Sequence, residues 1–349
     1  MTASVFDHPF LSGLLGDEEI GAQFSAAAEL SAMLRFEVAL AEAEAAEGVV
    51  PVEAAKAIAA LPEAFLADLD ALKQAIGRDG VVIPDLVRQW RAMLGDQGRH
   101  LHFGATSQDA IDTGLMLRLG AVLSILGQRL MAIISSLEGL EQRLGTQSLM
   151  GRTRMQAAIP ITVSDRLSSW KGPVVAHRAT LQDMLKTGLP LQFGGAAGTL
   201  DKLGDKAPVV RARLSDLLQL SDRPQWHSQR ATIAEIGGLF SQITGGLGKI
   251  GQDLALMADN GTALIGGGGA SSAMPHKRNP VKAEVLVTLA RFNAVQISGL
   301  HQSLVHEQER SGAAWTLEWM ILPQMAIATG AATRLGTEIL QSIEELGER

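Results

Sequence analysis

Apolar residues recur at helical spacing along most of this chain. Segment 108–144 has apolar side chains every three or four residues and stops at Gly145. Segment 18–47 is rich in Ala and Glu, and Gly48 followed by Pro51 is typical of a helix end. The same pattern predicts further helices over 52–76 with a break near Pro62, 85–94, 162–187, 233–260, 281–308 and 315–346.

These helices are unusually long for a compact monomer. Several exceed the usual ~11–12 residues by a factor of two or three, which favours a long bundle shared between subunits. We therefore predict an all-α fold, with a small N-terminal helical domain over 1–100 and a central long-helix bundle over 101–349. The glycines within 233–260 weaken an isolated helix by up to ~1 kcal/mol each. Their presence there indicates that neighbouring helices approach closely.

Composition narrows the classes of function. The 349 residues are 46% hydrophobic and 4% aromatic, with a net charge of -7 and no cysteine. The acidic balance argues against nucleic acid as a partner, and the lack of cysteine excludes disulfides and favours a reducing, cytoplasmic compartment. We expect no secretory leader and, since every apolar run of 18 residues contains charge, no membrane span. Glycine loops for nucleotides and acidic or histidine clusters with metal-ligand spacing are both lacking, so we expect neither a cofactor nor a metal.

The segment 266–280, Gly-Gly-Gly-Gly-Ala-Ser-Ser-Ala-Met-Pro-His-Lys-Arg-Asn-Pro, carries the strongest candidate chemistry. Four consecutive glycines permit a loop that opens and closes. Ser271 offers a hydroxyl and Lys277 a cation for an anionic ligand, which suits a lid over a site. Asn279 followed by Pro280 predicts a helix start with Asn279 as the N-cap. The alternative is a glycine-rich surface loop before a helix.

A second candidate lies where a connector becomes the long helix, at 102–109. Thr106 and Asp109 have the spacing of a capping box, which alone accounts for Asp109. The unpaired N–H groups of a helix start, with the hydroxyls of Thr106 and Ser107, also suit a carboxylate ligand. His102 precedes them in the same segment.

Three further segments carry basic or small residues. Arg152, Arg154 and Gln156 lie just before a predicted helix, and arginine forks match carboxylates; the alternative is a solvated basic turn. Segment 192–199 is rich in Gly and Ala and is either a tight turn or a close backbone approach to a ligand. Segment 226–230 ends in Arg230 and contains a histidine for which a structural role is at least as good an interpretation as catalysis.

Positive charge is concentrated in these loops although the protein is acidic overall. This contrast indicates a small polyanionic ligand. We therefore predict that the substrate-binding residues include His102, Thr106, Ser107, Arg152, Arg154, Gln156, Arg230 and Lys277, while Arg310 is a further candidate for anion binding.

Segment 271–280, Ser-Ser-Ala-Met-Pro-His-Lys-Arg-Asn-Pro, resembles the signature of the fumarase/aspartase superfamily, and the other segments follow in the order of that superfamily. The resemblance covers 6–346. It implies a mostly α-helical fold in three parts, a homotetramer with each active site built from three subunits, and chemistry without a metal. It also implies that Ser271 is the catalytic base and that Lys277 and Asn279 hold a carboxylate of a small polycarboxylate substrate.

Within the superfamily, the chain is most similar to cycloisomerases that lactonise a carboxylated muconate in protocatechuate catabolism. The segments that carry this similarity are 83–88, 102–112, 226–230 and 307–319. The superfamily's lyases usually have histidine at the position of Arg154. Their alkoxide or amide leaving groups need a proton, and positioned acid catalysis contributes ~10²–10⁴ in rate. A carboxylate leaving group, with a pKa near ~4, needs no proton at neutral pH. Arginine in place of histidine therefore favours a cycloisomerase over a fumarate-releasing lyase.

Two alternatives stay open at this point. The first is that the chain is a fumarate-releasing lyase of the same superfamily, of the adenylosuccinate or argininosuccinate type. The second is that it is a non-catalytic structural homologue. Many relatives also carry a C-terminal helical domain of roughly a hundred residues, which we expect to be shortened or absent here.

Overall fold

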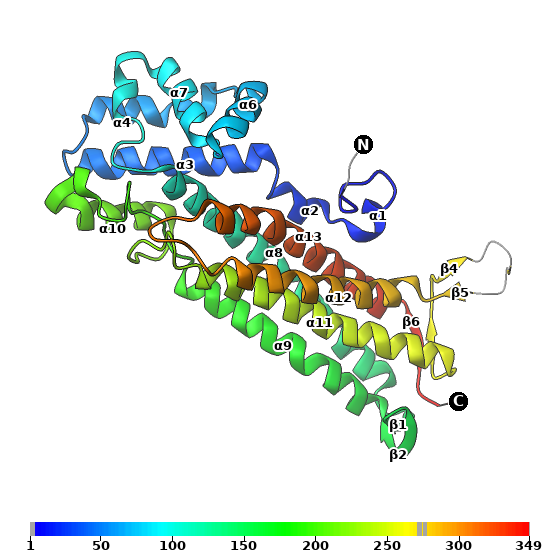
Figure 1. Ribbon diagram of the computed structural model, residues 1–349. Coiled ribbons are helices and arrows are strands. Elements are labelled where there is room, and N and C mark those ends of the chain that lie inside the picture. Colours follow the sequence, from blue (N-terminus) through cyan, green and yellow to red (C-terminus); the bar gives the residue numbers. More distant parts are fainter. Residues whose placement is uncertain (1–3, 271–273, 275–277, 349) are drawn as a thin grey trace.

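The computed structural model describes residues 4–270, 274 and 278–348. Five long helices run side by side as an elongated bundle, as Figure 1 shows. The bundle helices are α8 (Ser107–Leu144), α9 (Val163–Thr187), α11 (Ala231–Asp259), α12 (Val281–Gln302) and α13 (Gly312–Gln341). The predicted all-α bundle is confirmed, and the central helix begins within one residue of its predicted start.

Shorter helices form a layer at one end of the bundle (Figure 1). The helix α3 (Ala26–Ala46) lies between this layer and α8, and α10 (Ala207–Leu218) packs against α3. The remaining elements are α1 (Ser12–Leu15), α2 (Glu18–Ala22), α4 (Val52–Ala59), α5 (Leu61–Ala64), α6 (Leu69–Asp79), α7 (Ile83–Leu94), and the 3₁₀ helices η1 (Gly95–His100) and η2 (Asp201–Lys206).

Two apolar cores hold the described part of the chain together. One fills the bundle, and the other joins α3, α4, α6 and α7 to α10. The second core draws on residues 191–218 as well as on the first hundred. The N-terminal layer is therefore completed by a later segment of the chain, and the predicted boundary near residue 100 stays a prediction.

Glycines let the bundle helices α11 and α12 approach closely, as expected. A Cβ added at Gly248 would lie 2.5 Å from Cβ of Ala290, and one added at Gly251 would lie 2.5 Å from the carbonyl oxygen of Ala283. Both distances are far below van der Waals contact. Any larger residue at these two positions would therefore push the helices apart.

Three short antiparallel strand pairs were not predicted. They are β1 (Ser148–Thr153) with β2 (Gln156–Thr162), β3 (Ala263–Ile265) with β6 (Ile343–Leu346), and β4 (Gly269–Ala270) with β5 (Arg278–Asn279). Each is too small to form a layer. All three pairs lie at the end of the bundle opposite the N-terminal layer (Figure 1).

Several helix boundaries differ from the prediction. The helices predicted to reach residues 308 and 346 end at Gln302 and Gln341, and Ile343–Leu346 forms the strand β6. Segment 18–47 breaks into α2 and α3, because Ser25 forms a new N-cap that accepts from the N–H of Ala28. The helix after the signature segment begins at Val281 with Pro280 at the N-cap position. Asn279 is therefore not the cap: it lies in β5 and is paired with Gly269.

The helix α8 is long and apolar enough, by length and composition, to cross a membrane. From the charges within its apolar runs, we expect no membrane span in this chain. In the structure, the side chains of Leu119, Leu123, Leu126 and Leu130 are fully buried in the bundle core. This is the packing of a central bundle helix.

Candidate active site

The start of α8 is organised by one buried carboxylate, that of Asp109. Thr106 is the N-cap residue, and its backbone N–H donates to Asp109, so the predicted capping role is confirmed. The side chain of Asp109 is fully buried and accepts several hydrogen bonds. They come from the backbone N–H groups of Thr106 (3.0 Å), Gly194 (2.9 Å) and Gly195 (2.9 Å), and from the side chains of Gln192 (3.0 Å) and His227 (3.0 Å).

Asp109 thereby brings together three of the predicted segments, 102–109, 192–199 and 226–230. The two glycines are needed for this contact. A Cβ at Gly194 would lie 2.6 Å from Cβ of Gln225, and Gly195 has φ +68° with a Cβ position 2.7 Å from the carbonyl oxygen of Gly104. Segment 192–199 is thus a close backbone approach to Asp109 and to the loop before α8.

One turn further along α8, Asp112 anchors a buried ion-pair network. It pairs with Arg230 at 2.5 Å and accepts from the indole N–H of Trp315 at 3.0 Å. Arg230 also pairs with Glu318 at 2.5 Å and stacks on Trp226 at 4.6 Å from the ring centroid. Burial alone would lower the pKa of Arg230, but the charge of Asp112 and the hydrogen bonds to both carboxylates raise it.

Arg230 therefore stays cationic and is 1% exposed. Its guanidinium makes four hydrogen bonds to Asp112 and Glu318. In this chain it acts as an internal tie between α8 and α13, and its predicted contact with substrate stays a prediction.

Arg310 reaches this same region from the connection between α12 and α13. Its Nε donates to the amide oxygen of Gln108 at 3.0 Å, and its NH2 donates to the carbonyl of Ala196 at 3.3 Å. Gln108 in turn donates to Asp112 at 3.0 Å. Arg310 is thus a cation at the same helix start as Thr106 and Ser107.

His102 lies in the connector before α8 with a left-handed backbone, φ 60°. Its Nδ1–H donates to Glu37 of α3 at 2.5 Å, and both side chains are largely buried. Two turns along α3, the carboxyl group of Glu44 is fully buried and has no hydrogen-bond partner among the residues that the structure describes. Burial and the nearby charge of Glu37 raise the pKa of Glu44 to about 9, so it is protonated at neutral pH.

Sequence reasoning missed the buried acids Glu37, Glu44, Asp112 and Glu318. A signal was present in each case, because a carboxylate inside an apolar helix is rarely buried unless it is paired. The cationic partners of Glu37, Asp112 and Glu318 lie 65 to 118 residues away in the sequence, whereas Glu44 has none among the described residues. An acidic residue within an apolar helix therefore indicates that a partner exists, but the sequence does not show which residue it is.

The other predicted site residues that the structure describes lie at the opposite end of the bundle. Arg152, Arg154 and Gln156 are exposed on the β1–β2 hairpin. Arg154 and Met155 form its two-residue turn with φ values of 47° and 65°, the backbone of a type I′ turn. This conformation is unfavourable for residues other than glycine and asparagine, and it places Arg154 at the tip.

Asn279 lies in β5 at this same end of the bundle. Ser271 and Lys277 lie outside the described residues. Because α8 rises ~1.5 Å per residue, its two ends are about 55 Å apart. One chain therefore brings His102, Thr106, Ser107 and Arg230 together at one end, and holds the hairpin and Asn279 at the other (Figure 1).

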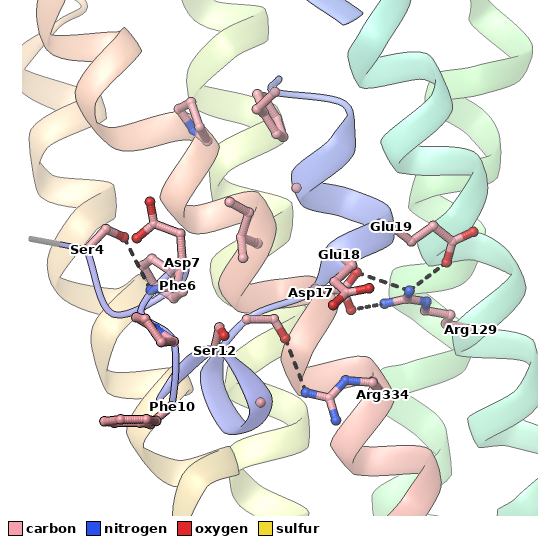
Figure 2. Close-up of a pocket in the computed structure, with 17 residues that line it drawn as sticks. Ser4, Phe6, Asp7, Phe10, Ser12, Asp17, Glu18, Glu19, Arg129 and Arg334 are labelled. Atoms are coloured by element: carbon pink, nitrogen blue, oxygen red, sulfur yellow. Dashed lines mark hydrogen bonds and ion pairs between the residues drawn. The ribbon is translucent and has the colours of Figure 1, made fainter. Parts of the chain in front are cut away.

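A cavity of about 1000 Å³ lies elsewhere, beneath the N-terminal segment. Figure 2 shows that Arg129 and Arg334 point into it from α8 and α13. Arg129 pairs with Asp17 at 2.5 Å and with Glu19 at 2.6 Å, while Arg334 donates to the carbonyl of Gly16 at 3.2 Å. These contacts fasten the N-terminal segment to the bundle. Of the predicted site residues within the described ranges, none lines the cavity.

The profile of the lyase family matches residues 17–299 of this chain. A 3-carboxy-cis,cis-muconate cycloisomerase from Pseudomonas aeruginosa is 37% identical over 338 residues, which cover 94% of this chain and 74% of that protein. A 3-carboxy-cis,cis-muconate cycloisomerase from Pseudomonas putida is 36% identical over 354 residues, which cover 99% of this chain and 83% of that protein.

Solved structures agree with this match. The 3-carboxy-cis,cis-muconate lactonizing enzyme from Pseudomonas putida has a TM-score of 0.90 at 35% identity, covering 96% of this chain and 77% of that one. A fumarate lyase from Mesorhizobium sp. BNC1 has a TM-score of 0.89 at 28% identity, covering 95% of this chain and 76% of that one. The chain thus belongs to the lyase family of the fumarase/aspartase superfamily, as its signature segment predicted.

Proposed function

We propose that this protein catalyses the intramolecular lactonisation of 3-carboxy-cis,cis-muconate in protocatechuate catabolism. The observation that carries this proposal is its similarity, over nearly its whole length, to relatives that bear the name of this cycloisomerase. The exposed Arg154 at the hairpin tip supports it chemically, because a guanidinium can orient a carboxylate without having to supply a proton.

In the proposed reaction, an oxygen of one substrate carboxylate adds to a carbon of the conjugated double bond. The electron pair of that bond moves to the neighbouring carbon and is delocalised into the carboxylate attached to it. Lys277, Asn279 and the donors of Thr106 and Ser107 stabilise this negative charge. Ser271 then gives its hydroxyl proton to the carbon and is reprotonated from solvent, so that the substrate gains one C–O and one C–H bond.

We further propose a cytoplasmic homotetramer in which several subunits build each active site. The separation of about 55 Å along α8 supports this arrangement, because residues at opposite ends of one chain cannot touch one small substrate. Exposed apolar side chains on the bundle helices support it as well. They include Val175 (46% exposed), Val295 (71%) and Met320 (63%).

The first test follows the absorbance of 3-carboxy-cis,cis-muconate when the purified protein is added. We expect the conjugated chromophore to disappear and no fumarate to be released from adenylosuccinate, argininosuccinate or malate. Cleavage of a succinyl compound, with carboxymuconate left intact, would overturn the proposal in favour of a fumarate-releasing lyase.

The second test concerns Ser271 and the sharing of sites. We expect Ser271→Ala to lower kcat by ~10²–10⁴ with the thermal unfolding midpoint retained, and His102→Asn to weaken substrate binding. Because the two positions come from different subunits of one site, mixed oligomers of the two variants regain part of the activity. Near-normal turnover by Ser271→Ala would remove Ser271 from its role, and mixed oligomers without recovery would refute shared sites.

A further inference from the structure

The contact between Glu37 and His102 has no part in the reaction proposed above, yet it joins a predicted substrate-binding residue to a buried acid. The exposed fraction of the side chain is 13% for His102 and 0% for Glu37. The two atoms that meet, Nδ1 and Oε1, are 2.5 Å apart. A charge-assisted contact of this length in a dry environment is among the stronger hydrogen bonds in proteins.

The contact also selects the orientation of the ring. With Nδ1–H held by Glu37, the opposite nitrogen, Nε2, is left for a second partner. The backbone of His102 is left-handed, φ 60°, and Gly104 follows with φ 69°. The carbonyl of Gly104 packs against Gly195, one of the residues held by Asp109. The connector that carries His102 is therefore tied to the same helix start as Thr106.

We propose that Glu37 is a positioning residue of the substrate site, which orients the His102 ring and stabilises its positive charge so that Nε2–H meets a carboxylate of the substrate. This inference rests on the function proposed above. It assigns the role to Glu37 and not to Glu44, although both are buried acids on the same face of α3.

The charged groups around His102 agree with this assignment. Burial by itself lowers the pKa of His102, but the charge and hydrogen bond of Glu37, with a smaller effect of Asp109, outweigh both burial and the charge of Arg91. The pKa of His102 is therefore above its ordinary value. Glu44 adds no negative charge at neutral pH, because burial and the charge of Glu37 keep it protonated.

A metal site is a poorer explanation of the cluster. Among the described residues, no group of three or more His, Asp or Glu side chains is placed to hold a metal ion. Glu44 Oε1 and Oε2 and Glu37 Oε2 have no partner in the described part of the chain. A neutral Glu44 tolerates this isolation better than a carboxylate would.

The experiment compares Glu37→Gln with Glu44→Gln, two isosteric changes two turns apart on one helix. In Glu37→Gln, we expect the NMR titration of His102 to move to lower pH and KM for 3-carboxy-cis,cis-muconate at pH 8 to rise about tenfold, with a smaller change in kcat. The rise in KM shrinks only at pH values low enough to protonate His102 without Glu37, because burial then lowers the pKa of His102. Glu44→Gln leaves both the titration and KM unchanged.

A double-mutant cycle shows whether Glu37 acts through His102. In a His102→Asn background, Glu37→Gln should change KM less than about twofold, whereas an undiminished tenfold effect would overturn the proposal. An unshifted titration in Glu37→Gln, or an equal effect of Glu44→Gln, would overturn it too. If the wild-type protein does not consume carboxymuconate, the proposed function fails by itself, and the titration still decides whether Glu37 sets the charge of His102.

Discussion

At the start of α8, charged side chains are buried and paired with one another, whereas at the far end of the bundle the arginines of the β1–β2 hairpin are exposed. Asp112, Arg230 and Glu318 are each 1% exposed or less and hold α8, α13 and the start of α11 together. Arg152 and Arg154 have no comparable partners within the described residues. The first group stabilises the fold of a single chain, while the second is available to a ligand or to another subunit.

This difference separates stability from activity. Removing one member of a buried ion pair leaves a charge in a medium that solvates it poorly. Removing an exposed arginine costs the fold little, so any loss it causes should appear in turnover. The two ends of the bundle can therefore be tested independently.

The largest expected effect is that of Asp112→Ala. It leaves Arg230 with Glu318 alone and removes the acceptor of the Trp315 indole N–H. We expect the free energy of unfolding to fall by ~3–5 kcal/mol, measured by urea unfolding. Asp216→Ala, an exposed acid on α10, is the matched control and should change stability by under ~0.5 kcal/mol. Equal stabilities of the two variants would contradict the role of the buried network.

A smaller effect, on activity and not on stability, is expected from Arg154→Asn. Asparagine tolerates the left-handed backbone at this turn, so the unfolding midpoint should be unchanged or slightly higher. The loss of the guanidinium should lower kcat/KM for carboxymuconate about 10–100-fold. Lys56→Asn, which removes an exposed cation from α4, should leave kcat/KM unchanged. An Arg154→Asn protein that is fully active but less stable would contradict this prediction, because it would give Arg154 a structural role instead of a role in activity.

The smallest effect concerns pH and Glu44. Its pKa of about 9 means that the folded protein keeps a proton which the unfolded chain releases near pH 4.5. The wild-type stability therefore falls as pH rises between these two values. Glu44→Gln removes this contribution, so its stability relative to wild type should increase by about 1 kcal/mol from pH 5 to pH 6. Unfolding curves of both proteins that shift in parallel with pH would show that Glu44 is ionised in the fold.

Much of the bundle was predictable from the sequence, because helical periodicity is local. Segment 108–144 matched α8 within one residue, and the glycines of α11 correctly indicated close packing. The β1–β2 hairpin was not predicted. Its strands have little buried surface, and its turn residues, Arg154 and Met155, lack the Asn-Gly pattern of a type I′ turn. The helix α10 was missed because it completes a core formed mainly by residues far before it.

The sequence by itself determined the helices, the signature segment and the family, since each of these depends on residues that are close together in the sequence. Only the tertiary structure decided which charged side chains are buried and paired within the chain and which stay exposed to a ligand. Arg230 and Arg154 are the same residue type in similar loop-like segments, yet one is enclosed by two carboxylates and the other is exposed. The reason is that burial and pairing depend on residues that are distant in the chain and meet only when the helices pack.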